Sequence, residues 1–145
     1  KVVNSALLVK SGDESLATLD CSCIDLFTGR TELYKAGAPA TYIVKNNRVT
    51  KCELASMPAG ILRGIEFAKR TAVLSDGDLI VMVSDGITDP GSEWLSGILT
   101  GFENVPPQQI ADEILKEALN ITKDMKEDDM SVIAARLNRF DDSRD

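Results

Sequence analysis

The sequence contains no histidine among its 145 residues. This absence excludes several common catalytic devices within the chain: a Ser-His-Asp triad, a Cys-His pair, histidine-ligated zinc and a histidine general base. Any catalysis by this chain must therefore use carboxylates, Lys or Arg, Ser or Thr, Cys, or a metal ion bound through oxygen.

Long apolar runs and excess positive charge are also lacking. No run approaches the roughly 18 apolar residues of a membrane span, and no signal-peptide pattern opens the chain. The net charge of −7 argues against a nucleic-acid partner, because neutralising a phosphate backbone requires a basic surface. The acidic composition suits cation binding as well as plain solubility. The length is that of one globular domain.

Cysteine is scarce and its number is odd: Cys21, Cys23 and Cys52. Two residues apart, Cys21 and Cys23 share one face if they lie on a strand. Free cysteines are usually buried, so we expect reduced core thiols and a reducing compartment.

Hydrophobic periodicity divides the chain into helical and extended segments. Near-helical spacing predicts a helix over residues 2–9, and alternation or apolar runs predict strands that follow it. Asn46-Asn47 is expected to form a hairpin turn. The expected strands are 16–26, 30–37, 40–45, 48–54, 65–74, 78–85 and 131–137, and the expected later helices are 91–102 and 106–123. Antiparallel strands with grouped helices indicate a layered α+β architecture.

The tripeptide Ser-Asp-Gly occurs twice, in different contexts. Ser75-Asp76-Gly77 lies between two strand patterns, which predicts a tight hairpin. Ser84-Asp85-Gly86 follows an apolar strand and precedes a helix. Two interpretations of Asp85 remain open at this point, namely a helix N-cap and a metal ligand.

An acidic pair, Asp128-Asp129, directly precedes the last predicted strand. Such pairs are usually solvated loop residues. If Asp85 and this pair lie at the ends of strands in one sheet, however, their carboxylates can converge on Mg²⁺ or Mn²⁺, which prefer oxygen ligands and keep several waters.

Several motifs resemble a known family. "VSDGITD" (83–89) and "EDDMSVIAARL" (127–137) are similar to the last two motifs of the metal-dependent protein phosphatase 2C (PPM) family. Residues 3–49 and "MPAGIL" (57–62) resemble the phosphatase domain of the stage II sporulation protein E family. The resemblance covers nearly the whole chain.

The resemblance implies a layered α-β-β-α sandwich of the protein phosphatase 2C type, with residues 1–145 forming the C-terminal portion of a single such domain. It also implies two Mn²⁺ or Mg²⁺ ions and a metal-bridging water that attacks a phosphoryl group, chemistry that needs no histidine. Asp85 and Asp128 match the metal aspartates. Asp129, often Asn in relatives, is the weaker ligand candidate, and Gly86 is expected to allow a tight turn beside the metal.

Two parts of the family pattern have no match in this sequence. One is the early Asp-Gly motif that bridges both ions, and the other is the basic residue that binds the substrate phosphate. We therefore expect both to lie upstream of Lys1. Alone, this chain is expected to bind metal weakly, to hydrolyse phosphate poorly and to self-associate.

The resemblance implies a serine/threonine phosphatase whose substrate is a phosphorylated anti-anti-sigma factor in sporulation sigma-factor regulation. It places the protein on the cytoplasmic side of a membrane, anchored through an upstream region. The alternatives are a stress-response phosphatase of the same superfamily, a non-catalytic phosphatase-like interaction module, and a structural α+β domain with solvated acidic loops.

Overall fold

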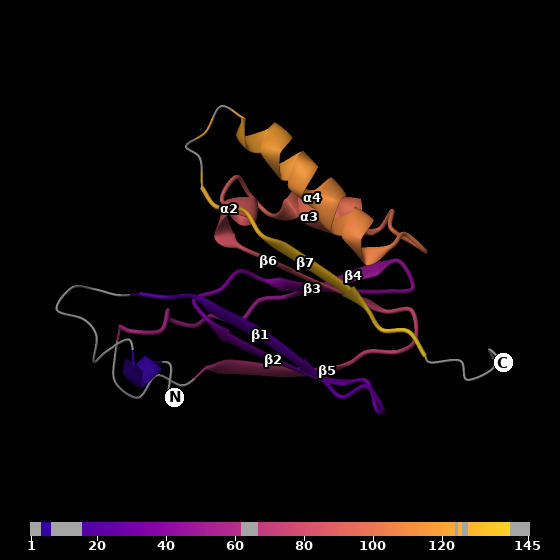
Figure 1. Cartoon of the computed structure of the whole chain (residues 1–145), viewed down its shortest axis with the longest axis horizontal. Helices are drawn as coiled ribbons and strands as arrows, with labels where there is room; N and C mark the ends of the chain where they lie inside the picture. The colour runs from indigo at the N-terminus through magenta and orange to yellow at the C-terminus, as the bar shows by residue number, and fades with distance from the viewer. Residues whose placement is uncertain (1–3, 7–15, 62–66, 124, 126–127, 140–145) are drawn as a thin grey trace. The chain divides into compact units, whose positions relative to one another are not determined.

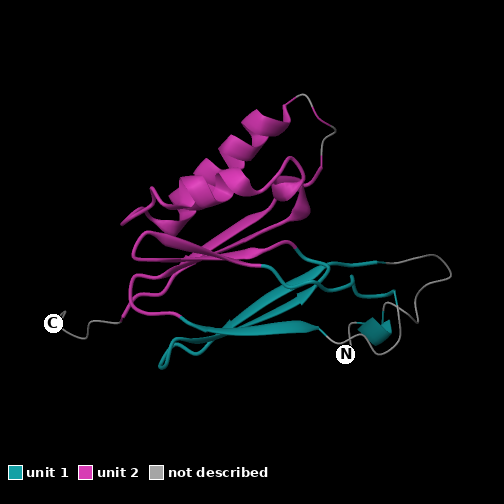
Figure 2. Cartoon of the chain, turned by 180° about the vertical axis from the view of Figure 1, so that it is seen from behind, with its two compact units in different colours: residues 1–38, 53–73 teal, residues 39–52, 74–145 magenta. Residues whose placement is uncertain are grey.

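The computed structural model describes residues 4–6, 16–61, 67–123, 125 and 128–139. These residues belong to two compact units (Figure 2): residues 1–38 with 53–73, and residues 39–52 with 74–145. Each unit contains one antiparallel sheet, and the helices that follow the strands belong to the second unit. The described elements are therefore those of an α+β protein, as predicted.

Unit 1 is built on a three-stranded sheet with the order β1-β2-β5 (Figure 1). Its strands are β1 (Leu19–Ile24), β2 (Arg30–Ala36) and β5 (Ala68–Val73). The turn between β1 and β2 is closed by Asp25, whose Oδ1 accepts hydrogen bonds from the backbone N–H groups of Phe27 and Thr28, at 2.9 and 3.2 Å. These bonds lower the pKa of Asp25, because they stabilise its charged form.

On β1, the sheet of unit 1 largely buries a charged side chain on one face and exposes two cysteines on the other. Lys35 on β2 is 0% exposed, and its Nζ lies 2.5 Å from Oδ2 of Asp20, its direct neighbour on β1. Because side chains alternate along a strand, the face that buries Asp20 leaves Cys21 and Cys23 on the other face, where both are exposed. The prediction of buried thiols is therefore wrong for Cys21 and Cys23. It is confirmed for Cys52.

Gly37, just after β2, contacts the loop that contains Pro58. Its φ is +65°, and a Cβ built at Gly37 would lie 2.6 Å from Cγ of Pro58 and 2.8 Å from its backbone N. The Gly37 N–H donates to Oγ of Ser56 at 3.1 Å. Glycine is thus required here both by the left-handed backbone and by the lack of space.

Gly37→Ala is expected to destabilise unit 1 by about 2–4 kcal/mol, the combined cost of a left-handed alanine and of overpacking. Urea unfolding followed by far-UV circular dichroism measures the change. Gly97→Ala is the matched control, since Gly97 is helical and a Cβ built there meets nothing within 4 Å apart from its chain neighbours and the backbone of its own helix. That control is expected to stabilise by about 0.5–1 kcal/mol. Equal effects of the two substitutions would contradict the role of the Pro58 contact.

Unit 2 contains a four-stranded antiparallel sheet with the order β4-β3-β6-β7. Its strands are β3 (Thr41–Lys45), β4 (Arg48–Cys52), β6 (Leu79–Val83) and β7 (Val132–Arg136). Asn46 and Asn47 form the β3–β4 turn with φ values of 47° and 59°, which confirms the predicted hairpin. The apolar strand β6 lies between β3 and β7, and four of its five residues are buried.

Three helices follow β6: α2 (Asp85–Thr88), α3 (Glu93–Leu99) and α4 (Pro107–Thr122). The longer helices α3 and α4 lie over one face of the unit 2 sheet (Figure 1). The predicted apolar stripe of α4 is buried at three positions one turn apart, which explains its helical period. The fully buried members of this core include Tyr42, Val81, Ile87, Leu95, Leu99, Ile110, Ile114 and Ala118.

The first Ser-Asp-Gly tripeptide forms a turn that is not a hairpin. Gly77 has a φ of +82°, and the Asp78 N–H donates to the Ser75 carbonyl at 3.0 Å. The strands on either side, however, belong to different sheets, since β5 pairs with β2 whereas β6 pairs with β3 and β7. The predicted hairpin is therefore wrong. Asp76 instead accepts a hydrogen bond from the Arg139 N–H at 2.6 Å.

Two expected segments lie partly or wholly outside the described residues. Residues 4–6 are helical, in agreement with the predicted first helix, but the rest of that helix and residues 140–145 are not described. Within the described part of the chain, no helix combines the length and apolarity needed to cross a membrane.

Candidate metal centre

Asp85 is the first residue of α2, and only Ser84 separates it from the end of β6. The N-cap of this helix is Ser84, so the N-cap interpretation of Asp85 does not hold. Oδ1 of Asp85 accepts a hydrogen bond from the Gly86 N–H at 3.1 Å. The Asp85 carbonyl accepts from the Asp89 N–H at 2.8 Å, which fixes the backbone in a helical turn. The side chain is exposed.

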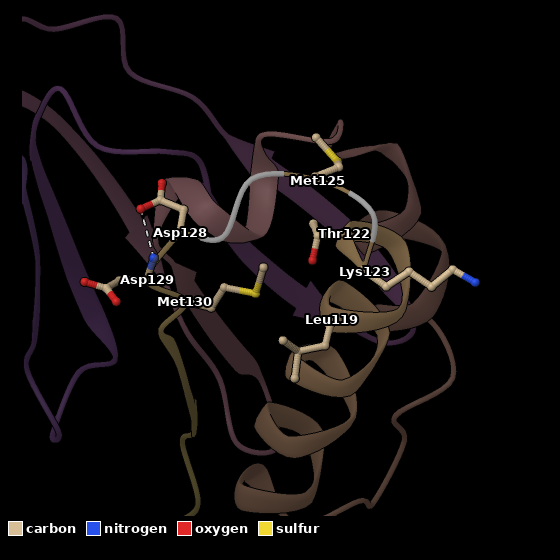
Figure 3. Close-up of a pocket in the computed structure, with 7 residues that line it drawn as sticks. All are labelled: Leu119, Thr122, Lys123, Met125, Asp128, Asp129 and Met130. Carbon is tan, nitrogen blue, oxygen red and sulfur yellow. Dashed lines mark hydrogen bonds between the residues drawn. The ribbon is translucent and has the colours of Figure 1, made fainter.

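Asp128 and Asp129 are exposed and lie in the segment that leads into β7. Oδ1 of Asp128 accepts a hydrogen bond from the Asp129 N–H at 2.8 Å (Figure 3). Asp85 and Asp128 therefore share one local geometry, in which each carboxylate binds the N–H of the next residue. Among the described residues, no hydrogen bond reaches Oδ2 of either side chain, so one oxygen of each is available to a ligand.

The two acidic segments are joined by what we call the Ser84 junction, formed by Ser84, Asp129 and Ser131. The Ser84 N–H donates to the Ser131 carbonyl at 3.0 Å, and the Ser131 N–H donates to Oγ of Ser84 at 2.9 Å. The Ser84 hydroxyl in turn donates to the Asp129 carbonyl at 3.2 Å. This junction extends the pairing of β6 with β7 and places the Asp85 and Asp128 segments side by side.

Gly86 is necessary for a different reason from the one predicted. It is not among the residues with positive φ, so no tight turn depends on it. A Cβ at Gly86 would instead lie 2.6 Å from the carbonyl oxygen of Asp129. The expectation of a tight turn is therefore wrong. The absence of a side chain allows α2 to contact the Asp128-Asp129 backbone.

A pocket of about 580 Å³ adjoins the acidic segment (Figure 3). Asp128, Asp129 and Met130 form one side, and Leu119 and Lys123 from the C-terminal end of α4 form part of the other. Leu119 is 55% exposed although Ala118, one residue before it, is fully buried, so Leu119 lies beside the buried stripe of α4 and not on it. Sequence reasoning singled out neither Ser84 nor Lys123. A serine between a strand and a helix looks like an ordinary cap, and Lys123 carries no motif.

The donor set is suited to a hard divalent cation but is incomplete. Asp85 and Asp128 offer carboxylate oxygens, the donors that Mg²⁺ and Mn²⁺ prefer, and these ions keep part of their water shell. Within the described residues, no group of three Cys, Asp or Glu side chains is arranged to hold a metal ion. The described residues thus offer part of a carboxylate site.

Comparison with known proteins identifies the family. The sequence profile of the family described as Stage II sporulation protein E (SpoIIE) matches residues 1–138. The chain is 31% identical over 144 residues to Stage II sporulation protein E of Bacillus subtilis, and this match covers 95% of the chain but 17% of that protein. A relative from Priestia megaterium is 29% identical, and 24% of its length is covered. The chain thus spans less than a quarter of these relatives.

Solved structures show the same fold. The Mn-presoaked phosphatase domain of the cell fate determinant SpoIIE from Bacillus subtilis matches with a TM-score of 0.77 and 29% identity, over 99% of this chain and 67% of that one. The catalytic domain of the serine/threonine phosphatase PstP of Mycobacterium tuberculosis, in complex with 2 manganese ions, matches with a TM-score of 0.71. Its identity is 18%, over 93% of this chain and 65% of that one, so it shows the fold alone. By sequence and by fold, this chain belongs to the Stage II sporulation protein E family, whose solved phosphatase domain has the protein phosphatase 2C fold.

Proposed function

We propose that this chain is the C-terminal portion of a Mn²⁺- or Mg²⁺-dependent serine/threonine phosphatase domain. The observation that carries the proposal is the Ser84 junction, which brings Asp85 and Asp128 to one edge of the unit 2 sheet. The fold shared with the SpoIIE phosphatase domain supports it. The chain covers 67% of that domain, and we propose that the remaining ligand belongs to the part that it does not cover.

In the proposed mechanism, Asp85 and Asp128 would hold the cations through their available oxygens, while the N–H groups of Gly86 and Asp129 orient the carboxylates. Asp129 contributes its backbone to the junction and is the weaker ligand candidate. When bound, a pair of such ions supplies an activated water and neutralises the charge on a phosphoryl group. The role of this chain is to supply two carboxylates that bind the metal ions and to fix the distance between these carboxylates.

We further propose that the substrate is a phosphoserine of an anti-anti-sigma factor and that an upstream region anchors the protein at the cytoplasmic side of a membrane. Membership of the sporulation family supports both statements. A non-catalytic interaction module is the second candidate. The lack of a three-residue acidic cluster among the described residues is the observation that favours it.

Removal of divalent metal tests the proposal. The whole protein that carries this chain is expected to release phosphate from a phosphoserine protein in the presence of Mn²⁺, to lose this activity in EDTA, and to regain it when Mn²⁺ is restored. The 145-residue chain alone is expected to be far slower. Phosphate release is measured directly. Activity that persists in EDTA contradicts the metal mechanism. A whole protein that binds its partner but stays inactive with Mn²⁺ or Mg²⁺ supports the interaction module.

A further inference from the structure

We propose that Ser84 is a positioning residue for the metal centre and that its hydroxyl sets the placement of the Asp128 segment relative to Asp85. The inference rests on the proposed metal-dependent function. It assigns to the serine of the Ser-Asp-Gly motif a task distinct from helix capping and from metal binding.

The hydroxyl of Ser84 is committed to the acidic segment. It accepts a hydrogen bond from the Ser131 N–H at 2.9 Å and donates one to the Asp129 carbonyl at 3.2 Å. An N-cap hydroxyl would instead accept from a backbone N–H of its own helix, and Ser84 makes no such bond. Both hydrogen bonds of the side chain therefore join residues 45 and 47 positions away in the sequence.

The backbone hydrogen bonds that the structure describes between β6 and β7 do not extend to Asp129, so they cannot fix its position in place of the Ser84 hydroxyl. The β6–β7 register ends at the pair Val83 and Val132, and one further backbone bond joins the Ser84 N–H to the Ser131 carbonyl. Beyond Ser131 the backbone carries exposed acidic residues outside the strand. The Asp129 carbonyl is held there by the Ser84 hydroxyl, and the Asp129 N–H is bonded to Oδ1 of Asp128. Ser84 thus acts on Asp128 through a single intervening residue.

Gly86, in α2, lies against the Asp129 carbonyl and so limits its movement toward the helix. The backbone of α2 comes so close to the Asp129 carbonyl that a built Cβ would lie 2.6 Å from it. The carbonyl therefore has little freedom, being hydrogen-bonded by Ser84 and adjoined by Gly86. Partners that orient metal ligands in this way typically contribute about 10–100-fold to metal affinity or activity.

The test compares Mn²⁺ binding by the whole protein and its variants. Ser84→Ala removes both side-chain hydrogen bonds and is expected to weaken Mn²⁺ binding about tenfold or more, measured by calorimetry or by the paramagnetic resonance of free Mn²⁺. Ser84→Thr keeps a hydroxyl and is expected to recover most of the affinity. Ser92→Ala is the matched control, since the Ser92 hydroxyl also bonds another segment, through Nζ of Lys51 at 2.9 Å. It is expected to leave Mn²⁺ affinity unchanged.

A second readout separates this inference from the proposed function. Amide hydrogen exchange at Ser131 is expected to accelerate in Ser84→Ala without any metal, because the N–H loses its acceptor. If wild-type protein binds no Mn²⁺ but exchange accelerates, the proposed function fails while the junction stands. If Ser84→Ala is folded and binds Mn²⁺ as wild type does, the inference is overturned.

Gly86→Ala provides an independent variant should Ser84→Ala fail to fold. It leaves the hydroxyl in place but forces the Asp129 carbonyl away from α2. We expect a similar loss of Mn²⁺ affinity. Unchanged affinity in this variant would show that the position of the Asp129 backbone does not control the metal site.

Discussion

Asp85→Asn is expected to lower kcat/KM of the whole protein for a phosphoserine substrate by at least about a hundredfold. Loss of a residue that merely orients a ligand costs about 10–100-fold, and loss of the ligand charge itself costs more. The asparagine oxygen can still accept the hydrogen bond that the Gly86 N–H gives to Asp85, so the local fold should persist. Steady-state kinetics at saturating Mn²⁺, with Mn²⁺ affinity measured in parallel, detect the change.

Three companion substitutions sharpen this result. Asp128→Asn is expected to behave as Asp85→Asn does, because both carboxylates have the same local geometry. Asp129→Asn should keep most of the activity, since its backbone, rather than its side chain, takes part in the Ser84 junction. Asp89→Asn, at the other end of α2, controls for general loss of negative charge and should change kcat/KM little. A loss in Asp89→Asn as large as that in Asp85→Asn would refute the assignment of Asp85 as a ligand.

Local patterns predicted the elements well because their causes are local. The period of α4 follows from burial of Ile110 and Ile114, and the β3–β4 turn follows from two asparagines that tolerate positive φ. The positions of Asp85 after β6 and of Asp128 before β7 were predictable for the same reason. Each follows or precedes a strand that the sequence shows clearly.

Strand partners were not predictable from the same information. Asp-Gly between two strand patterns is the strongest short-range hairpin signal, yet β5 pairs with β2, more than thirty positions earlier. The two tripeptides differ for the same non-local reason. Ser75-Asp76-Gly77 connects two sheets, whereas Ser84-Asp85-Gly86 lies against a segment that the sequence places more than forty residues away.

The faces of β1 were misjudged because a charge occupies a position that pattern analysis reserves for apolar residues. Cys21 and Cys23 share one face and were expected to face the core. The structure instead buries the face of Asp20, because Lys35 provides a partner for its carboxylate. The pairing of β1 with β2 brings Lys35 beside Asp20 and so allows both charges to be buried. The residue pattern of β1 alone does not show which residue lies opposite Asp20.

This ion pair leads to a large expected effect on stability. Lys35→Met is expected to destabilise unit 1 by about 3–5 kcal/mol, because it leaves the carboxylate of Asp20 in a mostly buried position without its cation. Asp20 is 15% exposed, too little for water to replace the ammonium group fully. Urea unfolding followed by far-UV circular dichroism gives the change in the free energy of unfolding.

Two further variants distinguish the cost of burying an unpaired charge from the loss of the attraction between the two charges. Lys69→Met breaks the exposed pair between Lys69 and Glu32 on the same sheet, where the side chains are 45% and 24% exposed. Solvent screening keeps that loss well below the loss expected for Lys35→Met. The double variant Lys35→Met with Asp20→Val removes both buried charges and should recover most of the stability lost in Lys35→Met, since burying an unpaired charge, rather than losing an attraction, is the main cost. If the double variant is as unstable as Lys35→Met, the attraction itself holds β1 to β2. Equal losses in Lys35→Met and Lys69→Met would show instead that burial of the pair adds nothing.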